Sequence, residues 1–303
     1  MSLFTGVVVR TLPLMPKALV WRVARRYVAG PALADAVATV KRLNGEGAMA
    51  TVDVLGEEVS ERSLATRAAD DYLEVLRAIA AERLDSNVSI KPTMFGLKID
   101  EALCREQIER LVQAAHAQGT FVRIDMEDRT TTDATLRIYR DLHERYGNVG
   151  VVLQAYMRRT LGDIEGLPES GANVRICKGI YVEPREVAWK GFETVRANYV
   201  AALDKLLSRG VYVGIATHDE YLVEAATALL DRHRVPRERY EFQMLLGVED
   251  ELRRILIAAG HRLRVYVPFG GDWYLYSLRR LRENPAIAGH VIRAVLGLQP
   301  RTG

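Results

Sequence analysis

The stretch Val211-Tyr-Val-Gly-Ile-Ala-Thr-His218 decides the fold of this chain. Its first six residues are apolar, aromatic or glycine, and no polar side chain alternates with them. Such a run is typical of a strand that is buried on both faces of a parallel sheet. Two polar residues end the run, and a helical pattern follows over residues 220–233. The stretch therefore predicts one strand–helix unit of a parallel sheet.

The same unit recurs along the chain, with predicted strands that begin about every 23 to 39 residues. The predicted strands cover residues 48–54, 87–90, 121–125, 151–155, 174–177, 211–216, 240–244 and 264–267. The predicted helices cover residues 61–83, 100–118, 132–146, 187–208, 220–233, 250–259 and 273–283. Eight units in 303 residues fit a (β/α)8 TIM-type barrel, which takes about 250 residues. We expect one domain, with an N-terminal helical segment (1–45) packed outside a barrel (46–303).

The composition is that of a globular protein, with 49% hydrophobic and 27% charged residues. No apolar run reaches the roughly 18 residues that a membrane-spanning helix needs. The two cysteines, Cys104 and Cys177, lie far apart, which favours a reducing compartment and a cytoplasmic location. The net charge of +3 is too small to indicate nucleic acid as a partner.

Positive charge is concentrated in residues 1–34, which carry five basic residues and no acidic one. This apolar, basic segment allows three interpretations. It forms helices that pack on the barrel, or an amphipathic surface for anionic lipid headgroups, or a targeting segment. No small-residue cleavage site follows an uninterrupted apolar stretch, so targeting ranks last.

Polar residues stand at the ends of seven of the eight predicted strands, where barrel enzymes carry their chemistry. They are Lys91, Asp125, Glu127, Asp128, Gln154, Arg175, Lys178, Thr217, His218, Gln243 and Tyr266. One such residue alone is usually a solvated loop residue, but this number favours a site. Arg175 and Lys178 flank an apolar strand, where an unpaired cation is costly. Either an anionic ligand compensates them, or they form ion pairs with Asp125 or Glu127.

The last predicted helix places Tyr276, Arg279, Arg280 and Glu283 on one face, at spacings i, i+3, i+4 and i+7. Two adjacent arginines beside a tyrosine suit a planar anion such as a carboxylate. The alternative is a solvated charged face.

Several cofactor and metal motifs are absent. The chain has no Gly-x-Gly-x-x-Gly after a strand, no phosphate-binding P-loop, no His-Glu-x-x-His and no Cys-x-x-Cys. Its six histidines are scattered, so we expect no metal site. Cationic and aromatic groups without a nucleophile or a metal favour a bound cofactor that carries the chemistry.

Five segments in order resemble the proline dehydrogenase family. They are Phe-Val-Arg-Ile-Asp-Met-Glu (121–127), Val-Arg-Ile-Cys-Lys-Gly-Ile-Tyr (174–181), Ala-Thr-His-Asp (216–219), Tyr-Glu-Phe-Gln-Met-Leu (240–245) and Tyr-Ser-Leu-Arg-Arg (276–280). The resemblance runs over residues 30–298, and the length resembles the single-activity bacterial enzymes. It implies a distorted (β/α)8 barrel with non-covalent FAD, a flavoprotein that oxidises L-proline to 1-pyrroline-5-carboxylate by hydride transfer.

The resemblance also implies partners and a place in metabolism. Electrons would pass from FAD to a membrane quinone, and the reaction would be the first step of proline catabolism to glutamate. A 1-pyrroline-5-carboxylate dehydrogenase would take the product. The enzyme would be cytoplasmic and peripheral on the inner face of the cytoplasmic membrane.

Roles for individual residues follow from the same resemblance. Arg175, Asp125 and Lys91 would be catalytic. The substrate would be bound by Lys91, Tyr266, Tyr276, Arg279 and Arg280. The cofactor would be bound by Gln154, Arg175, Lys178, Gly179, Tyr181, Thr217, His218 and Glu283. Glu57 would form a gate with Arg279. Asp219 stands where the family commonly has asparagine, and Val182 where it commonly has an aromatic residue; both bear on FAD affinity.

Other functions remain open on the residues alone. A flavin barrel could oxidise another cyclic imino acid. The cationic strand ends could instead hold a phosphorylated metabolite without catalysis. A membrane-associated scaffold is a third class.

Overall fold

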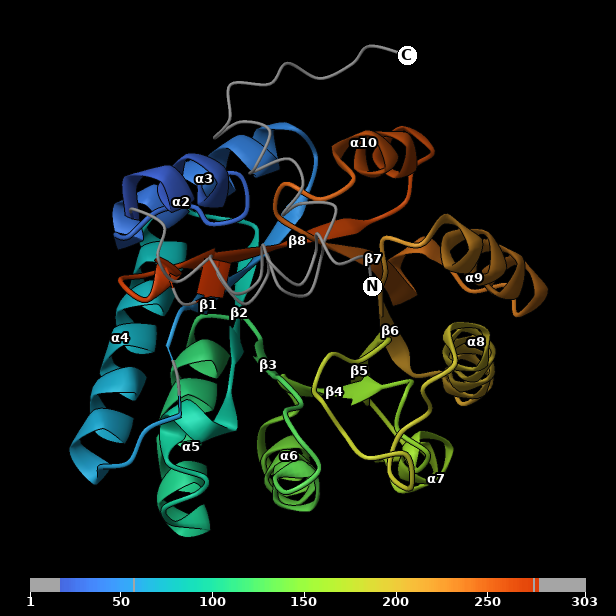
Figure 1. Ribbon diagram of the computed structural model, residues 1–303, viewed down its shortest axis with the longest axis horizontal. Helices are drawn as coiled ribbons and strands as arrows, with labels where there is room; N and C mark the ends of the chain where they lie inside the picture. The colour runs from blue at the N-terminus through green and yellow to red at the C-terminus, as the bar shows by residue number, and fades with distance from the viewer. Residues whose placement is uncertain (1–16, 57, 275, 278–303) are drawn as a thin grey trace, which may run out of the picture.

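A computed structural model describes residues 17–56, 58–274 and 276–277 of the chain (Figure 1). Eight parallel strands form a closed barrel in chain order, and β8 pairs with β1. The strands are β1 Met49–Val54, β2 Ser86–Ile90, β3 Val122–Ile124, β4 Val149–Gln154, β5 Asn173–Cys177, β6 Tyr212–Ala216, β7 Tyr240–Leu245 and β8 Leu263–Phe269. The predicted barrel is confirmed.

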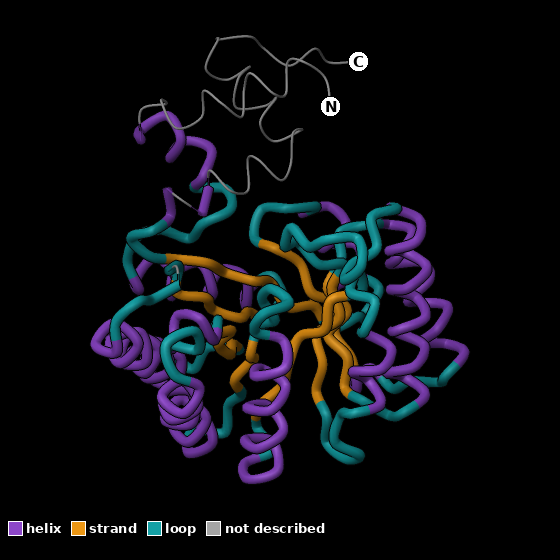
Figure 2. The backbone as a smooth tube through the Cα atoms, turned by 60° about the horizontal axis from the view of Figure 1, so that its bottom comes forward, coloured by secondary structure: helices purple, strands orange, loops and turns teal. Residues whose placement is uncertain are grey.

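A helix follows each of the first seven strands and packs on the outside of the barrel (Figures 1 and 2). These helices are α4 Arg62–Ala81, α5 Glu101–Ala117, α6 Thr132–Tyr146, α7 Thr160–Glu165, α8 Phe192–Ser208, α9 Glu220–Arg232 and α10 Asp250–Ala258. Two 3-10 turns, η2 Pro92–Phe95 and η3 Arg237–Arg239, complete the connections. The helices cover strands that are buried on both faces, as the sequence indicates.

The structure corrects the predicted helix over residues 187–208, because α8 begins only at Phe192. Residues 187–189 instead pair with the loop after β4. The amide of Trp189 donates to the carbonyl of Tyr156 at 2.8 Å, and the amide of Arg158 donates to the carbonyl of Val187 at 2.9 Å. The sequence analysis also missed α7, whose six residues are too few to give a helical period.

The N-terminal helices α2 Lys17–Ala24 and α3 Leu33–Gly45 lie outside the barrel, as expected. Ala36, Val40 and Leu43 of α3 are buried in the main core. The ring of Trp21 meets Trp273 edge-on, with 4.7 Å between centroids. Of the three interpretations of this segment, packing on the barrel holds for its described part. No helix within the described ranges is both long and apolar enough to span a bilayer.

Charged side chains are buried inside the barrel beside the apolar core. Asp53, Arg123, Arg175, Glu241 and Arg264 are all buried. Each of them is paired; for example, Arg123 donates to the carbonyls of β4 and β5 at 3.0 and 2.8 Å. Buried charges require such partners. The barrel interior therefore holds several ionised groups, each with its own hydrogen-bond or ion-pair partners.

Candidate active site

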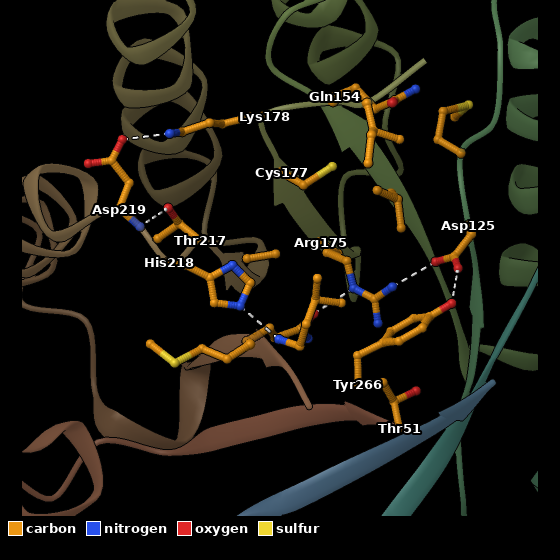
Figure 3. Close-up of a pocket in the computed structure, with 18 of the residues that line it drawn as sticks. Thr51, Asp125, Gln154, Arg175, Cys177, Lys178, Thr217, His218, Asp219 and Tyr266 are labelled. Carbon is orange, nitrogen blue, oxygen red and sulfur yellow. Dashed lines mark hydrogen bonds and ion pairs between the residues drawn. The ribbon is translucent and has the colours of Figure 1, made fainter. Parts of the chain in front are cut away.

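A cavity of about 570 Å³ opens at the carboxyl ends of the strands, which is the size of a cofactor or substrate pocket. All eight strands or the loops that follow them contribute to it. Its lining includes Thr51, Lys91, Asp125, Gln154, Arg175, Thr217, Gln243 and Tyr266. In Figure 3, Lys178 and Asp219 lie at one side of this cavity, and Asp125 and Tyr266 lie at the other.

Arg175 is the buried cation at the centre of the site. Its Nη1 donates to Asp125 Oδ1 at 2.6 Å and to Ser89 Oγ at 3.0 Å. The hydroxyl of Tyr266 donates to the other oxygen of Asp125 at 3.1 Å (Figure 3). Burial raises the pKa of Tyr266 well above its usual value, so the phenol stays protonated and keeps donating. The predicted ion pair with Asp125 is therefore formed.

Glu127, the other predicted partner, takes no part in this pair. Its carboxylate accepts hydrogen bonds from the amide of Thr93 at 2.8 Å and from the Thr93 hydroxyl at 2.6 Å. Glu127 thus fixes the turn after β2, which carries Lys91.

Lys91 forms an ion pair with Asp53, a residue that the sequence analysis missed. Asp53 is fully buried, and its Oδ2 has no hydrogen-bond partner among the described residues. Burial lowers the pKa of Lys91, but the nearby carboxylates, Asp53 first among them, together raise it more, so the ammonium stays charged. An aspartate inside the run Met-Ala-Thr-Val-Asp-Val (49–54) was the available signal, because a buried charge needs a partner.

A second group of charges lies at the opposite side of the cavity. Lys178 donates to Asp219 at 2.5 Å, and Arg196 donates to it at 2.8 and 2.7 Å. The Arg196 guanidinium also lies over the ring of Phe192, at 4.3 Å. Sequence reasoning missed Arg196 and Phe192, because they belong to α8 and not to a strand end.

Partial burial raises the pKa of Asp219, but hydrogen bonds from Arg196 and Lys178 lower it more, to about 2. The pairing therefore stabilises the fold above the unfolded pKa of about 4, and this contribution is lost as the pH falls toward 2.

We expect Asp219→Asn, which keeps the cap of α9, to cost about 1 kcal/mol of unfolding free energy at pH 7. Urea unfolding from pH 7 to pH 3 should show this difference shrink below pH 4. A difference that is constant with pH would contradict this reading.

The cofactor residues expected from the resemblance line the cavity in part. Gln154, Arg175, Lys178, Gly179, Tyr181, Thr217 and His218 all line it. Nε2 of His218 accepts the amide of Leu245 at 2.8 Å, so part of its role is to hold the start of the loop after β7. Glu57, Arg279, Arg280 and Glu283 lie outside the described residues. Tyr276 is buried in a cluster with Val28 and Leu55, and its substrate role stays a prediction.

Gly179 lets the loop after β5 cross the ring of Tyr156. Its φ is +104°, and a Cβ there would overlap that ring. We expect Gly179→Ala to lower the unfolding free energy by about 1–3 kcal/mol and to weaken ligand binding in the cavity. Gly260→Ala is the matched control, since Gly260 also has a positive φ but open space at its Cβ. Equal thermal unfolding shifts in both variants would show that backbone strain alone, and not the Tyr156 contact, sets the cost.

The described residues hold no group of three or more histidine, cysteine, aspartate or glutamate side chains that could bind a metal ion. The residues that line the cavity offer charge and hydrogen bonding.

Comparisons with known proteins agree on one family. The family model described as proline dehydrogenase matches residues 36–293. Proline dehydrogenase 1 of Bacillus subtilis subsp. natto is 37% identical over 273 residues, which is 90% of each chain. Proline dehydrogenase of Deinococcus radiodurans is 36% identical over 281 residues, or 91% of each chain.

Solved structures agree on the fold. Proline utilization A of Bdellovibrio bacteriovorus, inactivated by N-propargylglycine, aligns with a TM-score of 0.81 at 24% identity. The alignment covers 86% of this chain but only 32% of that one. The chain therefore spans about a third of the length of that larger protein.

Proposed function

Since this chain belongs to the proline dehydrogenase family, we propose that it oxidises L-proline to 1-pyrroline-5-carboxylate with FAD as hydride acceptor. Family membership by itself establishes an enzyme of proline oxidation, the first step of proline catabolism. The cofactor, the product and the roles of individual residues are the proposed part.

The distribution of charge in the cavity supports FAD. Among the described residues, Nη2 of Arg175 has no protein hydrogen bond, while its other two nitrogens are held by Asp125, Ser89 and Gln243. This free nitrogen suits the polar edge of a planar ring. At the other side of the cavity, the two positive charges of Lys178 and Arg196 exceed the single negative charge of Asp219, and this excess suits anionic phosphates. The arrangement fits a ligand with a flat hydrogen-bonding head and a phosphate tail, and it is the observation that carries the proposal.

In this proposal Lys91 binds the substrate carboxylate. An ammonium has three donors, and Asp53 takes one of them. Arg279 and Arg280 would complete the clamp, as the sequence predicts. Tyr266, held by Asp125, would form one wall of the substrate pocket. Such a clamp orients the ring carbon next to nitrogen toward the acceptor, and positioning of this kind lowers the barrier.

The overall step removes a hydride from that carbon and a proton from nitrogen, and a C=N bond forms. When bound, FAD supplies the two-electron acceptor. Arg175 provides positive charge beside the site where electron density arrives, and Asp125 and Gln243 hold it there before the reaction.

We also propose a membrane quinone as the final acceptor. The support is the surface of α2 and of the turn that follows it, on which Arg22 and Arg25 respectively are exposed. Each basic residue near an anionic bilayer contributes about 1 kcal/mol to membrane binding.

We expect the double variant Arg22→Gln/Arg25→Gln to bind phosphatidylglycerol vesicles about 30-fold more weakly in co-sedimentation. Lys41→Gln/Arg42→Gln on α3 removes the same charge and should bind as the wild type does; an equal loss in both pairs would contradict docking through α2.

The product is an imine that a further oxidation would consume, so a 1-pyrroline-5-carboxylate dehydrogenase is the proposed functional partner. The relative named bifunctional protein PutA of Escherichia coli is consistent with this. This chain covers only 24% of that protein, so room for a second activity lies outside the matched part.

Cofactor identity tests the proposal directly. The purified protein is denatured, and the released small molecules are identified by chromatography and mass. Release of FAD in equimolar amount is expected. A colourless protein that also takes up no added FAD would overturn the flavin proposal and favour a phosphate-binding barrel.

A further inference from the structure

A chain of hydrogen bonds runs from Arg175 across the barrel interior to β7 and β8. Nε of Arg175 donates to Gln243 Oε1 at 2.5 Å. Nε2 of the same amide donates to Glu241 Oε1 at 2.5 Å. Glu241 in turn accepts Nε and Nη2 of Arg264 at 2.7 and 3.0 Å. Arg264 is anchored by a hydrogen bond to the carbonyl of Ala50 in β1 at 2.7 Å.

The state of Glu241 decides which way the Gln243 amide points. Burial raises the pKa of Glu241, but the charge of Arg264 and the hydrogen bonds from Arg264, Gln243 and Tyr212 together lower it more, to about 2. Glu241 is therefore a carboxylate at neutral pH, and a carboxylate only accepts hydrogen bonds. The NH2 group of Gln243 must face Glu241, which turns its oxygen toward Arg175.

The backbone leaves room for this arrangement at Gly214 in β6. Gly214 pairs with Arg175 on one side and with Glu241 on the other. A Cβ at Gly214 would overlap the Gln243 amide. A glycine at this point lets one amide bridge β5 and β7 past the intervening strand.

We propose that Gln243 is a positioning residue for the reaction, which fixes Arg175 at the cavity, and that the Glu241–Arg264 ion pair sets the orientation of its amide. Asp125 restrains one end of the guanidinium and Gln243 restrains the other, so its rotation about the ion pair is blocked. Nη2, which has no hydrogen bond to the described residues, is thereby held in one orientation. This inference rests on the proposed role of Arg175 beside FAD.

The test uses Gln243→Met in the full-length protein, because methionine keeps the volume and removes the acceptor. Reduction of the bound flavin by excess L-proline is followed by stopped flow without oxygen. We expect the limiting rate to fall about 10- to 100-fold, as for loss of a hydrogen bond to a charged group, while the Kd for proline stays within about threefold. The flavin midpoint potential, measured without proline, should become more negative by about 30 mV, which corresponds to a tenfold change in the equilibrium constant of the two-electron reduction.

Two controls separate positioning from damage to the fold. Tyr212→Phe removes another hydrogen bond to Glu241, at 2.9 Å, but leaves Gln243 in place, and it should behave as the wild type does. In a double-mutant cycle with Arg175→Met, the Gln243→Met effect should disappear, because Gln243 acts through Arg175. Gln243→Asn, whose amide is one methylene too short, replaces Gln243→Met if that variant does not fold.

A folded, yellow Gln243 variant with wild-type rate and potential would overturn the inference. Effects that add fully in the double-mutant cycle would also overturn it. A wild-type protein that binds no flavin, or whose flavin proline does not reduce, would count against the proposed function itself.

Discussion

Arg175→Met is expected to slow reduction of the bound cofactor by proline about 100- to 1000-fold, the range seen when one preorganised donor is removed from a buried catalytic site. Arg175 is 7% exposed, and the barrel holds its charge next to the cavity before any ligand binds. The protein should still fold, because Asp125 keeps hydrogen bonds from Ser89 and Tyr266. Stopped-flow absorbance at saturating proline measures the effect.

Arg158→Met is the matched control for this substitution. Arg158 stands in the loop after β4, where its guanidinium stacks on Trp189 at 3.6 Å and does not line the cavity. Its removal should leave the rate of reduction within about twofold of the wild type. A similar rate loss in both variants, or none in Arg175→Met, would show that Arg175 does not stabilise the reaction.

Lys91→Met is expected to have the second large effect, on both substrate binding and stability. If Lys91 binds the proline carboxylate as proposed, loss of the ammonium removes a charge-assisted hydrogen bond to it and should raise KM about 10- to 100-fold. It also leaves the Asp53 charge buried without its partner. Breaking such a pair costs about 3–5 kcal/mol of unfolding free energy.

The double variant Lys91→Met/Asp53→Asn separates the two effects. Removal of the Asp53 charge should recover most of the stability, because no ionised group is then left unpaired in the interior. The KM for proline should stay high, because the substrate still lacks its cation. Urea unfolding and steady-state kinetics on the same preparations test this. Recovery of both properties would mean that Lys91 stabilises the fold and does not bind substrate.

Much of the fold could be predicted because parallel strands and helices alternate with a clear period. The run 211–216 is mostly buried, and its unbroken apolar pattern is typical of a strand in a covered parallel sheet. The prediction of a helix at residues 187–191 was wrong because of a tertiary contact. The local sequence is compatible with a helix, but backbone bonds to residues 156–158 hold it in an extended loop. Local patterns carry no information about such a partner.

The site was predictable where a polar residue ends a strand. Lys91, Arg175 and Thr217 were found in this way, and all three line the cavity. The residues that were missed lie elsewhere. Asp53 stands inside a strand that reads as apolar, and Arg196 stands on a helix whose start the sequence misplaced.

Glu241 and Arg264 illustrate a different limit. Each stands in a predicted strand, and either one alone could face solvent. The pairing of β7 with β8 turns two isolated charges into an ion pair next to Gln243. Strand order can be inferred from sequence, but which inward-facing residues meet depends on register, and register is not visible in composition.

The most direct measurement is the absorbance spectrum of the purified protein before and after excess L-proline is added without oxygen. We expect flavin bands near about 375 and about 450 nm, and we expect the longer-wavelength band to bleach as proline delivers its electrons. A flavin band that proline leaves unchanged would contradict the assignment of proline as the electron donor at this site.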